Sequence, residues 1–111
     1  MRLALPLMLS LLAANPAFAQ RTYEGREAAA LRCSNTLALT AVTLNRAELM
    51  SDPEKDALLD LTLRILERHV SGTWAQKKAA MAVMRDRRSV EDTLDDYRKN
   101  AVRCLTQFPI N

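Results

Sequence analysis

The sequence predicts an all-α protein: a small antiparallel bundle of three to four helices, closed by one disulfide bond and preceded by an N-terminal signal peptide. Three observations lead to this prediction. Helix start and stop signals follow one another along the chain, and only two Gly and four Pro occur among its 111 residues. Neither β-branched alternation nor hairpin dipeptides indicate strands. The two cysteines are an even number, as expected for an exported domain.

The N-terminus has the three parts of a secretory signal peptide. After a short basic start, residues 3–12 form an apolar run, and Ala17 and Ala19 supply the small side chains that a signal peptidase recognises. The run is about half of the roughly 20 residues that a membrane helix needs, and a helix-breaking Pro16 follows it. We therefore expect residues 1–19 to be removed by cleavage between Ala19 and Gln20, and the product to be periplasmic or passed further outside.

Residues 20–111 are expected to form a single helical domain. These 92 residues are enough for one modest core. Without Arg2 they contain 15 basic and 13 acidic residues, which is too even a balance to indicate nucleic-acid binding. A second apolar segment of spanning length is missing, so we expect no transmembrane segment in the mature chain.

Four helical segments are predicted in this domain. The first covers residues 26–50, with apolar residues at spacings of three and four. The second covers 53–70 and is apolar over most of its surface, so we expect it to be packed on several sides. The third covers 74–87, and the fourth, 90–107, has the most regular apolar seam. Because no Gly or Pro separates the last two, one bent helix is the alternative there.

Capping and turn residues support these boundaries. Asp52, Thr73 and Ser89 each stand where a side-chain oxygen can cap the following helix. Pro53 suits the first turn of the second helix, and Gly72 can take the left-handed conformation that ends it. The short connections favour antiparallel neighbours.

Cys33 and Cys104 are predicted to form a disulfide bond. Each lies on the apolar seam of its helix, near the start of the first and the end of the fourth. In an antiparallel bundle these two ends meet at the same pole. Two buried free thiols are the alternative, which a reducing compartment would favour. Export to an oxidising compartment favours the bond instead, and the absence of Cys-x-x-Cys indicates a structural role.

His69 is the only histidine, and a metal or haem site would depend on it. It lies at the end of the second helix, where its simplest role is to cap carbonyl groups. Together with Met81 and Met84, which are one turn apart, it could bind copper or haem. A methionine pair at this spacing more often fills a core, and no Cys-x-x-Cys-His motif is present. We therefore expect no cofactor and no metal.

Trp74 is the only tryptophan and the candidate anchor for a partner protein, because Trp is enriched at binding hot spots. The alternative, which the large apolar area of its ring favours, is that it folds over one end of the bundle. The Asp and Glu residues are expected on helix exteriors. There they are interleaved with Lys and Arg, and local ion pairs on solvated faces explain both.

No catalytic constellation accompanies these features, so we do not expect an enzyme. The sequence instead favours a periplasmic accessory module that acts by protein interaction, as a chaperone-like or inhibitor-like protein, with another envelope protein as its partner. A periplasmic carrier or sensor of haem or copper, using His69 with Met81 or Met84, is the alternative function.

Overall fold

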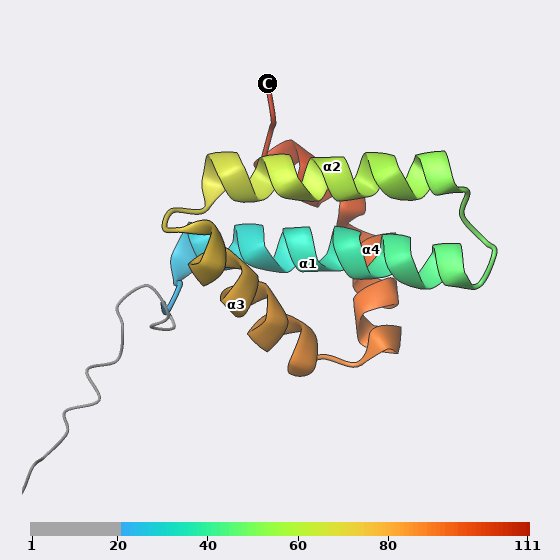
Figure 1. Cartoon of the computed structure of the whole chain (residues 1–111), viewed down its shortest axis with the longest axis horizontal. Helices are drawn as coiled ribbons and strands as arrows, with labels where there is room; N and C mark the ends of the chain where they lie inside the picture. Colours follow the sequence, from blue (N-terminus) through green and yellow to red (C-terminus); the bar gives the residue numbers. More distant parts are fainter. Residues whose placement is uncertain (1–20) are drawn as a thin grey trace, which may run out of the picture.

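The computed structural model of the chain describes residues 21–111 (Figure 1). The predicted signal peptide and its cleavage site at Ala19 and Gln20 lie outside these residues. The described part contains no strand, and its four helices are α1 (Gly25–Arg46), α2 (Asp52–His69), α3 (Trp74–Asp86) and α4 (Val90–Gln107). The all-α prediction is therefore confirmed, and the third and fourth helices are separate.

Helix α1 is the centre of the bundle. It contacts each of the other three helices. Helix α2 lies beside it and runs antiparallel, while α3 starts near the end of α2 and diverges from it, and α4 passes behind α1 (Figure 1). Nine residues of α1 are buried, against three of α2. The expectation that the second helix would be packed on several sides is therefore wrong.

Small side chains explain why α1 takes the central place. Ala30, Ser34 and Ala41 are fully buried, and they let the backbones of neighbouring helices approach closely. The longer side chains of Leu31 and Leu37 are also fully buried and fill the remaining space. In α2, by contrast, only Ile65, Leu66 and Thr62 are fully enclosed, while Leu58 and Leu61 pack on the edge of the core. Apolar content alone did not identify the central helix, because many of the buried residues of α1 are small or polar.

The N-caps follow the predicted chemistry with one difference. Thr73 forms a capping box with Gln76, and Ser89 Oγ accepts a hydrogen bond from the N–H of the residue three positions on. Helix α2, however, is capped by Ser51 and not by Asp52. The Asp52 carboxylate instead accepts a hydrogen bond from Asn45 Nδ2 at 2.7 Å. Asp52 is the first residue of α2. Its hydrogen bond with Asn45 joins the end of α1 to the start of α2.

The turn between α2 and α3 is held against the start of α1. Tyr23 donates a hydrogen bond from its hydroxyl to Ser71 O at 2.7 Å. Glu27 Oε2 accepts hydrogen bonds from the Ser71 hydroxyl at 2.6 Å and from the Ser71 N–H at 2.5 Å. These hydrogen bonds lower the pKa of the Glu27 carboxyl group, and the bond from the Ser71 hydroxyl has the larger effect. Gly72 follows with φ of 98°, the left-handed conformation predicted for it.

Replacing Gly72 by alanine is expected to lower the free energy of unfolding by about 1–2 kcal/mol, because a side chain strains this backbone conformation. An added Cβ would also lie 2.7 Å from Gln76 Oε1 and 2.8 Å from the Tyr23 hydroxyl, and would disturb both the capping box and the Ser71 contact. Urea denaturation of the Gly72→Ala variant measures the loss. Gly25→Ala is the informative comparison, since it shares a positive φ but has open space around it. Equal losses of stability in the two variants would show that the crowding around Gly72 adds nothing to the cost of the strained backbone.

Within residues 21–111, no helix combines the length and apolar character that crossing a bilayer requires.

Candidate functional site

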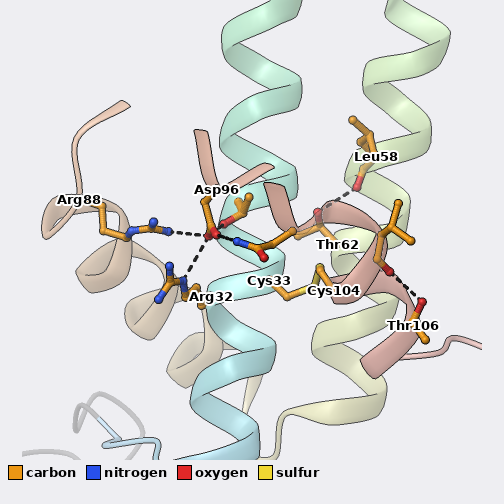
Figure 2. Close-up of a disulfide and its surroundings, with 11 residues drawn as sticks. Arg32, Cys33, Leu58, Thr62, Arg88, Asp96, Cys104 and Thr106 are labelled. Carbon is orange, nitrogen blue, oxygen red and sulfur yellow. Dashed lines mark hydrogen bonds and ion pairs between the residues drawn. A yellow bond between two sulfur atoms is a disulfide. The ribbon is translucent and has the colours of Figure 1, made fainter. Parts of the chain in front are cut away.

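The predicted disulfide bond joins Cys33 of α1 to Cys104 of α4 (Figure 2). Their Cα atoms are 5.5 Å apart, within the usual range for a disulfide. Both residues belong to the buried apolar cluster, together with Leu37, Ile65 and Phe108. The bond is therefore part of the core between the first and last helices, where a structural crosslink is expected.

Asp96 lies beside the disulfide and collects hydrogen bonds from three elements (Figure 2). Its Oδ2 accepts from Arg32 Nε at 3.2 Å, Arg88 Nη1 at 3.3 Å and Thr36 Oγ1 at 3.1 Å. Its Oδ1 accepts from Asn100 Nδ2 at 2.7 Å. Because α1, α4 and the connection between α3 and α4 all supply donors, this one carboxylate ties them together.

The environment of Asp96 favours its ionised form. Burial alone would raise the pKa of Asp96, but hydrogen bonds from Asn100, Arg32 and Thr36 outweigh it and, with the charge of Arg32, lower the pKa to about 2. The side chain is only 10% exposed. The expectation that all acidic residues lie on helix exteriors is therefore wrong at this position, where the charged donors offset the cost of burying a carboxylate. All its acceptor positions serve the fold, so we assign Asp96 a structural role.

His69 lies at the end of α2, as predicted, but contacts the C-terminal segment. Its Nε2 is 2.7 Å from Pro109 O, and its ring packs edge-on against Phe108 with centroids 5.4 Å apart. Met81 and Met84 both pack on the apolar core and line two different grooves. The described contacts thus join His69 to the C-terminus and the methionines to the core. Within residues 21–111, no cluster of three or more His, Cys, Asp or Glu side chains is placed to hold a metal ion.

An apolar groove of about 600 Å³ lies over α1 between α2 and α3. The two flanking helices meet at their connection and diverge, so they form a V with α1 between its arms (Figure 1). One face of α1 and the facing sides of α2 and α3 line the groove: Asn35, Ala38, Leu39, Val42 and Arg46; Leu59, Thr62, Leu63 and Leu66; and Trp74, Lys78, Met81, Ala82 and Arg85. We call this surface the α1–α3 groove.

The charge of the α1–α3 groove has a single sign. Arg46, Lys78 and Arg85 line it, and none of the described lining residues carries a carboxylate. Arg85 contacts Asp86 through Nε at 3.4 Å, an exposed pair that contributes little because solvent screens it. An apolar surface with cationic side chains around it attracts a ligand that is both apolar and anionic.

Asn35 gives the groove a buried polar group. The residue is 3% exposed, and its Nδ2 has no hydrogen-bond partner among the described residues. A buried amide N–H that lacks an acceptor costs free energy, so native structures usually satisfy it. Ser34 Oγ and Thr40 Oγ1 of α1 are likewise buried without a partner among the described residues.

Trp74 lines the α1–α3 groove and is 50% exposed. The favoured interpretation of the sequence, a ring folded over one end of the bundle, does not describe a half-exposed side chain. Leu63, across the groove on α2, is 48% exposed. Two large apolar side chains therefore remain accessible on the same surface, as expected at a site that contacts another molecule.

Replacing Trp74 by alanine is expected to lower the free energy of unfolding by only about 1–2 kcal/mol, because half of the side chain is already in water and only the buried half contributes. Ile65→Ala is the control for a core position, since Ile65 is fully buried and should lose roughly 2–5 kcal/mol. Urea denaturation followed by circular dichroism compares the two variants. A loss at Trp74 as large as that at Ile65 would identify the indole as part of the core.

Sequence reasoning pointed to Trp74 but missed the groove around it. The spacing of Asn35, Leu39, Val42 and Arg46 marks one face of a helix, yet nothing in the pattern shows that this face is left open. Asn35 resembles any polar residue of a helix exterior until its burial is known. The divergence of α2 and α3 depends on packing angles, which local sequence does not specify.

Comparisons with protein-family models, with curated proteins and with solved structures found no match to this chain. A function for it therefore rests on its own residues.

Proposed function

We propose that this protein is an exported, periplasmic accessory module without enzymatic activity, which binds another envelope protein through the α1–α3 groove. The observation that carries the proposal is the exposure of Trp74 and Leu63 in one apolar groove of about 600 Å³. Trp is enriched at binding hot spots, and binding sites are typically concave and mostly apolar with a few polar groups. The disulfide and the signal-peptide pattern support an oxidising compartment.

Site-specific photocrosslinking in the source cells tests this function. A photoreactive amino acid at Leu63, inside the groove, is expected to form one crosslinked product with an envelope protein. The same amino acid at Val102 is the matched control, because Val102 is an exposed apolar residue on α4 outside the groove. Equal products from both positions, or none from either, would contradict binding at the groove.

The compartment is tested on the same cells. Osmotic shock should release the protein, and N-terminal sequencing of the released chain should begin at Gln20. Recovery of the intact chain with its first residues in the cytosolic fraction would overturn the periplasmic assignment.

A further inference from the structure

We propose that the segment bound in the α1–α3 groove is an amphipathic helix of about three turns, with acidic side chains along the borders of its apolar stripe. This inference rests on the proposed function and specifies the chemistry of the partner. Two features of the groove carry it: its length along α1 and the spread of its cationic side chains.

The length of the groove fits a short helix. Its residues on α1 run from Asn35 to Arg46, a distance of about 16 Å at 1.5 Å per residue, or three helical turns. Helices α2 and α3 diverge on either side of α1, so a further helix laid between them would meet apolar side chains from all three. Amphipathic helices bind such grooves through apolar residues spaced three, four and seven apart.

The cationic side chains are too widely spread for one small anionic headgroup. Lys78 and Arg85 are seven positions apart on α3, which places them on the same face about 10 Å from each other along the axis. Arg46 lies on a different helix. Carboxylates that recur every one or two turns of a partner helix match this arrangement, whereas a fatty acid carries a single carboxylate at one end.

Two synthetic helical peptides test the proposal on the oxidised protein. Both carry the same leucine stripe, and they differ in having either Glu or Lys along its borders. Binding is followed by the fluorescence of Trp74, the only tryptophan, which should shift to shorter wavelength when the groove is covered. We expect the Glu peptide to bind at least about tenfold more tightly than the Lys peptide, and the difference to shrink at high salt.

Charge reversal provides the control. The double variant Lys78→Glu with Arg85→Glu should invert the preference, so that the Lys peptide binds more tightly. Arg68→Glu with Arg98→Glu changes the net charge by the same amount at exposed positions outside the groove, and should leave the preference unchanged. Circular dichroism of each variant confirms that it is folded before binding is measured.

Several outcomes would overturn the acidic helix. These are equal binding of both peptides, binding of neither, and a preference that charge reversal does not alter. A Trp74 shift produced by dodecanoate or anionic vesicles but not by the Glu peptide would identify a lipid site. A shift produced by raising the protein concentration would identify a second copy of the chain. Photocrosslinking at Leu63 reports on the proposed function independently, because it needs no assumption about the partner's charge.

Discussion

Reducing the disulfide bond between Cys33 and Cys104 is expected to lower the free energy of unfolding by about 4 kcal/mol. The bond closes a loop with a sequence separation of 71, and a crosslink over such a distance removes much conformational freedom from the unfolded chain. Domains of this size are usually stable by only about 5–15 kcal/mol. The reduced protein should therefore lie close to its unfolding threshold at 37 °C.

Urea denaturation of the oxidised and the reduced wild-type protein measures this loss without changing the sequence. The double variant Cys33→Ala with Cys104→Ala should resemble the reduced protein and should not respond to a reducing agent. A difference of less than about 1 kcal/mol between the oxidised and reduced forms would show that the bond contributes little beyond joining two helices that are already held together.

Replacing Asp96 by asparagine is expected to lower the free energy of unfolding by about 2–3 kcal/mol. The change removes the negative charge that contacts both Arg32 and Arg88. Breaking a fully buried ion pair costs about 3–5 kcal/mol, and the cost here is smaller because Arg32 is 57% exposed. Asp95→Asn is the matched control. Asp95 is more exposed and pairs only with solvated side chains, so its replacement should have little effect.

The contribution of Asp96 should depend on pH in a defined direction. Its pKa is lowered from 3.8 to about 2 in the folded protein. A carboxylate with a lowered pKa stabilises the fold above its ordinary pKa, and this stabilisation is lost as the pH falls through the folded value. The difference between wild type and Asp96→Asn should thus be constant above about pH 5 and shrink toward pH 2. A difference that persists at pH 2 would mean that the charge of Asp96 is not its cause.

The sequence predicts the helices of this protein well, because their signals are local. Thr73 and Ser89 cap α3 and α4 as predicted, and Gly72 takes its left-handed conformation. The disulfide could also be predicted, since an even number of cysteines and the expected compartment point to the same pair. What the sequence could not predict depends on packing. The burial of Asp96 and of Asn35 follows from how α3 and α4 cross α1, and those angles are set by contacts between distant residues.

The central position of α1 has a consequence for the order in which the chain assembles. Helix α2 follows α1 after a short turn, and the contact of Asn45 with Asp52 spans only seven positions. Helix α4 reaches α1 through pairs such as Arg32 and Asp96, which are 64 positions apart. Contacts between distant positions form more slowly, because a long loop must close first. We expect the α1–α2 hairpin to form early and to present an open face of α1, on which the C-terminal helix docks last.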